Sequence, residues 1–294
     1  MAGKIQVGFL VSYDYELLKT AIPTVYSEAD SVFLAIDINR KTWKGEDIFI
    51  DPSFFEWIDT YDKDRKIVIY EDDFFVSHFT TMQCEIRERK MLAEKMGIGN
   101  WLIQIDADEY FVDFKKFVTT LRKYDSYLIN PKEKPIQIFA FWVMLYKYTE
   151  NGILYVDKPL KAVFATNYPS YKNGRRIKGR QIYTDSIVLH ESLSRSEEEL
   201  RFKLQNWGHN TQINSEFMDK WLVVNEHNYK EYRNFYFIEP ERWKKLGFLP
   251  TKDIKEVKEW LETHGSLRVS KKKVFFKNLG QRFKFFMKKL KGKV

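Results

Sequence analysis

Hydrophobic and polar positions follow two rhythms over the first 115 residues. Four apolar runs predict buried strands, at residues 5–12, 31–38, 66–70 and 101–105. Residues 15–27 and 77–96 carry apolar side chains at helical spacing, and Pro23 is expected to kink the first of these helices. Strands that alternate with helices predict an α/β fold with a mostly parallel central sheet and flanking helices.

The pattern of the second half is less regular. Strand-like runs occupy residues 135–148 and 181–189. Residues 158–180 are polar and basic and contain Asn173-Gly174, which predicts a loop or hairpin. The remaining expected elements are a helix from Ser194 to about Trp207 that starts with capping-box character, a mixed aromatic stretch at 221–250 and a short helix at 253–263.

Composition indicates a globular protein with an unusual aromatic content. Apolar residues make up 44% and charged residues 31%, whereas Phe, Trp and Tyr reach 17%, which predicts an aromatic core or surfaces that stack on sugars. Cys84 is the single cysteine, which excludes an intrachain disulfide and a cysteine zinc site and favours a reducing compartment. The apolar run at 7–11 is too short for a signal-peptide core, and no stretch is long enough for a membrane span.

The net charge of +8 is concentrated at one end of the chain. Ten of the 49 Lys and Arg residues lie in residues 271–294, which contain no acid, and this leaves 39 basic against 41 acidic residues elsewhere. A nearly neutral body argues against a broad nucleic-acid-binding face, so we expect no nucleic-acid partner.

Three of the four strands of the first half end in or beside acidic residues: Asp37, Asp72 with Asp73, and Asp106 with Asp108. Parallel sheets bind ligands at the carboxyl ends of their strands. The strongest signal is WLIQIDADEYF at 101–111, where alternation along an extended chain would put Asp106 and Asp108 on one side. Two such oxygen donors suit Mg²⁺ or Mn²⁺ and leave positions for phosphate oxygens. The competing interpretation is a solvated acidic turn.

Residues 5–111 resemble GT-A-type glycosyltransferases, close to family 2, in variants with a Trp-led strand before an Asp-x-Asp-Glu-aromatic motif. The matching segments are VGFLVSYDYELL, LAIDINRKTWKG and DADEYF, in the family's order. The resemblance implies a GT-A-like catalytic domain at 1–265, with a nucleotide-sugar half at 1–115 and an acceptor half at 116–265. Residues 266–294 would form a basic amphipathic tail.

The resemblance also implies the cofactor and the donor. Asp108 would bind the metal, Mn²⁺ or Mg²⁺, directly, and Asp106 would contact the ribose or a metal-bound water. Val11, Ser12 and Asp37 match positions that hold the nucleoside. The donor would be a nucleotide-diphospho sugar, with a UDP-sugar favoured.

Gln83 and Arg87, one helical turn apart, match the family's helix that reaches over the sugar or phosphate, with Arg89 as a competitor for Arg87. An exposed polar stripe is the competing interpretation. Lys203, on the expected helix after residue 194, is a candidate phosphate contact.

His190 ends a strand and is expected to be a third metal ligand, in competition with a structural role. The catalytic base is open, because the family's usual acidic pair at a helix start is not evident. Asp185 and Glu191 are the nearest candidates for deprotonating the acceptor hydroxyl. A retaining enzyme would need no such base, so the stereochemistry also stays open.

The basic tail has an amphipathic pattern. The residues expected to contact a membrane are Phe275, Phe276, Leu279, Phe283 and Phe286 on one face, with Lys277, Lys284 and Lys288 opposite. Aromatic bulk opposite lysine is typical of a helix in an anionic membrane interface, although Gly280 weakens the helix. Packing on the domain and an oligomer interface are the rival interpretations.

These observations favour a metal-dependent glycosyltransferase, cytoplasmic and peripherally bound to the inner face of a bacterial membrane. Its acceptor would be a glycan or lipid-linked glycan of surface polysaccharide or lipopolysaccharide synthesis. One alternative is a catalytically inactive GT-A-like module that binds membrane or carbohydrate. An Asp-x-Asp phosphatase is a remote alternative, because the motif lies past residue 100 and continues Glu-Tyr. Nucleic-acid binding would depend on the tail alone.

Overall fold

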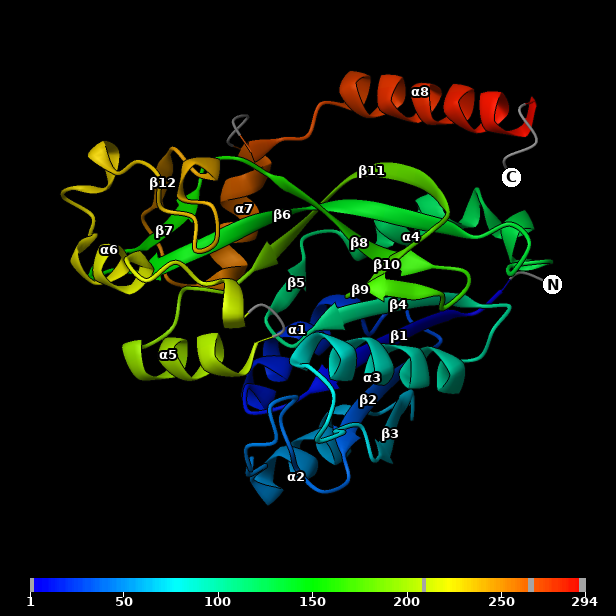
Figure 1. Cartoon of the computed structure of the whole chain (residues 1–294), viewed down its shortest axis with the longest axis horizontal. Helices are drawn as coiled ribbons and strands as arrows, with labels where there is room; N and C mark the ends of the chain where they lie inside the picture. Colours follow the sequence, from blue (N-terminus) through cyan, green and yellow to red (C-terminus); the bar gives the residue numbers. More distant parts are fainter. Residues whose placement is uncertain (1–2, 208–209, 264–266, 291–294) are drawn as a thin grey trace.

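The computed structural model describes residues 3–207, 210–263 and 267–290, with the backbone alone at residues 258, 262 and 284–290 (Figure 1). The strands are β1 (Ile5–Val11), β2 (Ser31–Asp37), β3 (Ile67–Asp72), β4 (Trp101–Asp106), β5 (Glu109–Phe111), β6 (Ile136–Tyr148), β7 (Ile153–Val156), β8 (Leu160–Thr166), β9 (Tyr171–Asn173), β10 (Arg176–Ile177), β11 (Arg180–His190) and β12 (Leu246–Leu249). The α-helices are α1 (Leu18–Val25), α2 (Pro52–Tyr61), α3 (Thr81–Met96), α4 (Phe114–Arg122), α5 (Glu197–Asn206), α6 (Phe217–Val223), α7 (Ile254–Thr263) and α8 (Lys271–Leu290). Short 3₁₀ turns lie at Tyr15–Leu17, Asp125–Leu128, Asn210–Gln212, Tyr229–Glu231 and Pro240–Arg242.

Within the described ranges, ten strands form one mixed sheet in the order β12-β7-β6-β8-β4-β1-β2-β3, with β11 beside β6 and β5 beside β11. The first half, β3-β2-β1-β4, is entirely parallel, as predicted. β1 is buried at every position, which explains why its sequence is apolar except for Gln6 and Gly8. The ends of these strands, including Asp37 and Asp106, therefore lie along one edge of the sheet.

Helices cover both faces of the parallel half (Figure 1). α1, α2 and α4 pack against the face that carries Val7 and Phe9, and α3 packs against the face that carries Leu10 and Phe33. α3 begins later than predicted, because Thr80 caps its first turn. The expected first helix is divided into a 3₁₀ turn and α1, which continues through Pro23.

The prediction for residues 158–180 is half right. The Asn173-Gly174 turn joins β9 to β10 as a hairpin, with Gly174 at φ +50°. The first part, however, is β8, a strand of the sheet interior between β6 and β4 and not a loop. Lys158 and Lys161 gave this segment a polar character that hid the short buried run at 162–166.

The rest of the second half adds antiparallel pairs and a second core. β8 pairs antiparallel with β4 and β6, and β7 pairs antiparallel with β6 and β12. α5 and α6 cover this region, and α5 begins after Ser196 with the predicted capping box. Part of the aromatic content lies inside this core, in side chains that include Tyr146, Phe217, Trp221, Phe235 and Trp243.

β11 contains a bulge. Tyr183 lies opposite Phe139 and Ile187 lies opposite Phe141, so four steps along β11 accompany two along β6. The tail helix α8 lies along the outer side of this strand (Figure 1). Asn278 of α8 accepts a hydrogen bond from the Tyr183 N–H and donates one to its C=O, both at 2.8 Å, and so anchors the helix at the bulge.

None of the helices in the described part of the chain is long and apolar enough to cross a membrane. α8 is nevertheless a continuous helix of 20 residues, as the amphipathic pattern predicted.

Candidate active site

A cavity of about 990 Å³ opens at the carboxyl edge of the parallel half. Its walls come from the ends of β1 and β4, from α3, from the β9–β10 hairpin and from α5, and it extends to the start of α8. Both Asp106 and Asp108 line it, together with His190 and Lys203. This is the edge at which parallel α/β sheets bind ligands.

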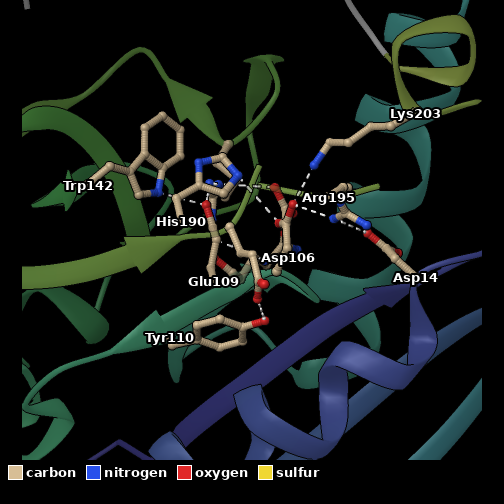
Figure 2. Close-up of polar contacts among 12 residues, drawn as sticks. Asp14, Asp106, Glu109, Tyr110, Trp142, His190, Arg195 and Lys203 are labelled. Atoms are coloured by element: carbon tan, nitrogen blue, oxygen red, sulfur yellow. Dashed lines mark hydrogen bonds and ion pairs between the residues drawn. The ribbon is translucent and has the colours of Figure 1, made fainter. Parts of the chain in front are cut away.

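Basic side chains from β11, α5 and the segment between them surround the Asp108 carboxylate. Figure 2 labels these side chains, which are His190, Lys203 and Arg195. Arg195 donates to Oδ2 at 2.8 Å, and Lys203 Nζ contacts the same oxygen. His190 Nε2 lies 3.4 Å from Oδ1, and Arg195 also reaches Asp14 Oδ2 at 3.1 Å. Asp108 is only 2% exposed, so these ion pairs are screened little by solvent.

Strand register brings Asp108 and His190 together. β5 and β11 pair antiparallel with His190 opposite Glu109, and the Glu191 N–H donates to the Asp108 C=O at 2.9 Å. Successive side chains of a strand point to opposite faces. His190 therefore lines the cavity, whereas Glu191 points beneath it.

A second ion-pair cluster lies beside the first, around Asp106 and Glu109. Arg89 of α3 donates to Asp106 Oδ1 at 2.7 Å, and Arg175 of the hairpin lies 3.7 Å from Oδ2. Arg175 also binds both oxygens of Glu109 at 2.6 Å. Trp142 Nε1 and the Asp106 N–H donate to the same Glu109 carboxylate, which is completely buried and fully hydrogen-bonded (Figure 2).

The two aspartates stay ionised because cations outweigh burial. Burial alone raises the pKa of Asp106, but the guanidinium groups of Arg89 and Arg175 hold it at about 2. Burial likewise acts to raise the pKa of Asp108, but Lys203, His190 and Arg195 hold it well below its usual range.

The expected geometry of the Asp-x-Asp motif needs a correction. β4 ends at Asp106 and a turn follows at residues 107–108, so strand alternation does not relate the two carboxylates. Both reach the cavity, but each does so with its own set of cations.

The three residues expected to hold the nucleoside all line the cavity: Val11, Ser12 and Asp37. Asp37 already accepts four backbone hydrogen bonds. The Asn39 and Lys41 N–H groups donate to Oδ1, and those of Phe74 and Phe75 donate to Oδ2. Asp37 thus organises the loops after β2 and β3, and a ribose contact would have to displace one of these donors.

Gln83 and Arg87 do not line the cavity. Gln83 completes the capping box of α3 with Thr80, and Arg87 donates to the Asp73 carbonyl. The face of α3 that meets the cavity carries Glu85, Glu88 and Arg89. The competitor Arg89 is therefore the arginine at the site, because two residues rotate the helix by about 200° and place Arg89 on the buried side, roughly opposite Arg87.

Neither base candidate lines the cavity. Asp185 forms an ion pair with Lys116 at 2.9 Å, on the side of β11 that faces α4. Glu191 accepts hydrogen bonds from the hydroxyl groups of Tyr110 and Tyr148 below the cavity, and burial raises its pKa. Both carboxylates have structural partners, and neither is placed to meet an acceptor hydroxyl.

The donors for a divalent cation are present only in part. In the described part of the chain, no three His, Cys, Asp or Glu side chains group closely enough to hold a metal ion, so the expected set Asp106, Asp108 and His190 is not assembled. Asp108 Oδ1 and His190 Nε2, 3.4 Å apart, fit as a pair of adjacent ligands, since octahedral ligands about 2.1 Å from a metal lie roughly 3 Å from each other. Mg²⁺ commonly takes one or two protein ligands plus substrate phosphates and water.

Several site residues were not anticipated from the sequence. Arg175 and Asp14 occupy segments that carry no periodic pattern, and Arg195 lies at the start of an expected helix without a predicted role. No role was predicted for Glu109 either. The sequence does contain one indication of a role for Glu109, because this residue is the Glu of the Asp-x-Asp-Glu-aromatic motif. Arg175 follows the Asn-Gly turn, and only the hairpin that folds back over β4 brings it to Asp106.

Comparison with known proteins matches this chain to no protein-family model and to no curated protein.

Proposed function

We propose that this protein is a metal-dependent glycosyltransferase that moves a sugar from a nucleotide-diphospho sugar to a glycan or lipid-linked glycan acceptor. The acceptor would belong to a bacterial surface polysaccharide or lipopolysaccharide. One observation carries the proposal. Asp106 and Asp108 lie beside four buried basic side chains in a large cavity at the carboxyl edge of a parallel sheet.

Such a cluster suits a diphosphate leaving group. Negative charge grows on the diphosphate as the glycosidic bond breaks, and oriented cations in a site with little solvent stabilise it strongly. Lys203 and Arg195 are held by Asp108 in the free protein, at the edge of the cavity. On donor binding, Lys203 can turn from Asp108 to a phosphate oxygen without leaving a buried charge uncompensated.

A divalent cation, held by Asp108 and His190, would supply Lewis-acid neutralisation of the same diphosphate. His190 lies beside Oδ1 of Asp108 and Lys203 contacts Oδ2, so the two oxygens of this carboxylate would serve the cation and Lys203 separately. His190 Nδ1 is buried and has no hydrogen-bond partner among the described residues, so the ring is oriented by packing on Trp142 at 4.8 Å between centroids.

One observation favours the inactive alternative, a module that binds nucleotide sugar without turnover. The sequence-predicted bases Asp185 and Glu191 both lie away from the cavity. A retaining reaction, which needs no separate base for the acceptor, is compatible with that placement.

Donor hydrolysis tests the proposal. The full-length protein is incubated with UDP-, GDP-, CMP- and TDP-sugars in Mn²⁺, Mg²⁺ or EDTA, and nucleotide release is measured. We expect slow, metal-dependent release that falls by about 100-fold or more in Asp108→Asn, because a transition-state charge partner is removed. Asp185→Asn is the matched control and should behave as wild type.

Three outcomes separate the hypotheses. Release that requires metal and Asp108 supports the transferase. A rise in Tm with nucleotide and metal, but no release, supports the inactive module. No release and no rise in Tm contradict both.

We also propose that α8 holds the protein at the inner, anionic face of a membrane. Phe275, Phe276, Leu279 and Phe283 are 50–66% exposed, whereas Val274 and Asn278 face the domain. The helix is strongly basic, as an anionic surface requires. Lys277 does not join the membrane face, because its Nζ lies over the Tyr183 ring. The side chains of Lys284, Phe286 and Lys288 lie outside the described residues.

Vesicle co-sedimentation tests the membrane contact. Wild type should bind vesicles of phosphatidylglycerol and phosphatidylcholine, and Phe276→Ser/Phe283→Ser should lose most of that binding. Phe49→Ser removes an equally exposed phenylalanine elsewhere on the surface and should change nothing. Unchanged binding by the double variant contradicts the proposal, and a larger mass for wild type in light scattering would indicate an oligomer interface instead.

A further inference from the structure

The part of the cavity around Asp106 and Asp108 is called the aspartate end below. The cavity has a second end, where the lining side chains are basic. Lys161 of β8, Arg176 of the hairpin, and Lys273 and Lys277 of α8 line it, around the rings of Phe141 and Tyr183. We call these four side chains the basic end. In the described part of the chain, none of the four forms an ion pair.

These cations share one location. Lys277 Nζ lies 4.7 Å from the Tyr183 ring centroid and Lys161 Nζ lies 5.8 Å from it. Burial lowers the pKa of Lys277, and the positive charges of Lys161 and Lys273 lower it further. The N-terminal end of α8 adds the positive end of a helix dipole to the same place.

Unpaired cations on neighbouring walls of a cavity are stabilised by an anion between them. The aromatic rings offset part of the repulsion through cation–π contacts, but they carry no net charge. A phosphate can accept hydrogen bonds from several ammonium groups and a guanidinium together. A phosphate group therefore fits the charge and the number of donors at the basic end.

We propose that the basic end binds a phosphate group of the acceptor. This inference rests on the proposed transferase function, in which the donor diphosphate occupies the aspartate end of the cavity and the acceptor the remainder. Because Lys273 and Lys277 belong to α8, the phosphate site adjoins the helix that carries the exposed aromatic face. That neighbourhood favours an acceptor whose phosphate joins a glycan to a lipid, over a neutral glycan.

Anion binding tests the inference without donor or metal. The full-length protein in EDTA is titrated by calorimetry with glycerol phosphate, and separately with vesicles of phosphatidate or of phosphatidylcholine alone. The test variant is Lys161→Gln/Lys273→Gln/Lys277→Gln. The matched control is Lys115→Gln/Lys123→Gln/Lys132→Gln, which removes the same charge from exposed lysines outside the cavity.

We expect the test variant to bind glycerol phosphate at least about tenfold more weakly than wild type, with the control unchanged. Glycerol phosphate binding shows that the phosphate group suffices, and binding confined to phosphatidate vesicles shows that the phosphate must be lipid-borne; either result supports the inference if only the test variant loses it. Equal binding by wild type and test variant, equal loss in both variants, or no binding by wild type overturns it. Donor hydrolysis is measured separately, so failure here leaves the proposed transferase standing.

Discussion

The two ends of the cavity differ in whether their charged side chains are paired with opposite charges. At the aspartate end, Asp106, Asp108 and Glu109 are matched by Arg89, Arg175, Arg195 and Lys203 through short buried contacts. At the basic end, four exposed cations line the cavity, and no carboxylate of the described residues is in ion-pair contact with them. A matched cluster is rigid and stable before any ligand arrives, whereas an unmatched one is completed by its ligand. The difference indicates that the first end orients chemistry and that the second recognises charge.

Removing one cation from the ion pairs of the aspartate end should have the largest effect on the free energy of unfolding. In Arg175→Met, the completely buried Glu109 loses its bidentate partner, and we expect about 3–5 kcal/mol of destabilisation. Arg40→Met, which breaks a partly exposed ion pair with Glu71, should lose less than about 1 kcal/mol. Urea unfolding of both variants measures this. A loss below 1 kcal/mol in Arg175→Met would show that the cluster does not stabilise the fold.

Glu88 is an exception at the aspartate end: it lines the cavity, but no cation of the described residues forms an ion pair with it. Burial raises its pKa to about 8, although Trp43 Nε1 donates to it at 2.6 Å. The folded state thus binds an extra proton between the ordinary pKa of 4.5 and about 8, so this carboxyl makes stability fall as pH rises through that window. Glu88→Gln keeps the acceptor for Trp43 and should gain roughly 1–3 kcal/mol over wild type at pH 8–9.

Unfolding at pH 5, 7 and 9 checks this sign, with the exposed Glu94→Gln as a control that should show a flat difference. A gain that shrinks toward high pH would contradict the assignment.

Substitution of Gln83 should lower the stability of the protein without changing its activity. Gln83→Ala removes one half of the α3 capping box and should cost about 0.5–1 kcal/mol. Since Gln83 lies outside the cavity, donor hydrolysis by the folded variant should match wild type. Hydrolysis reduced tenfold with unchanged stability would restore the role implied by the family resemblance.

The smallest effect is expected at the basic end. Lys273→Gln removes one of three neighbouring ammonium groups from the first turn of α8, where positive charge is unfavourable. We expect no loss of stability and a gain of up to about 0.5 kcal/mol at low salt, which 0.5 M NaCl abolishes. A destabilisation of 1 kcal/mol would show that Lys273 has a structural partner.

The sequence predicted those features that depend on neighbouring residues. The parallel half, the capping box at Ser196 and the tail helix follow from periodicity and local chemistry, and the structure contains them. The placement of β8 and the cations around Asp108 depend on contacts between segments 50 to 100 residues apart, which no local pattern encodes. The same limitation explains Arg87 and Arg89. Both fit a helical spacing, and only the packing of α3 on the sheet decides which one faces the cavity.

The bulge in β11 has a consequence for the identity of the site. Because it inserts an even number of residues, the strand resumes in phase and presents His190 upward and Glu191 downward. A chain shortened there by one residue would have to reshape the bulge or slip the following ladder by one place. Such a slip would turn His190 away from the cavity wall and put the Glu191 carboxyl in its place, although the amino-acid composition of the strand would be almost unchanged. The length of this stretch is thus as much a determinant of the chemistry as its composition.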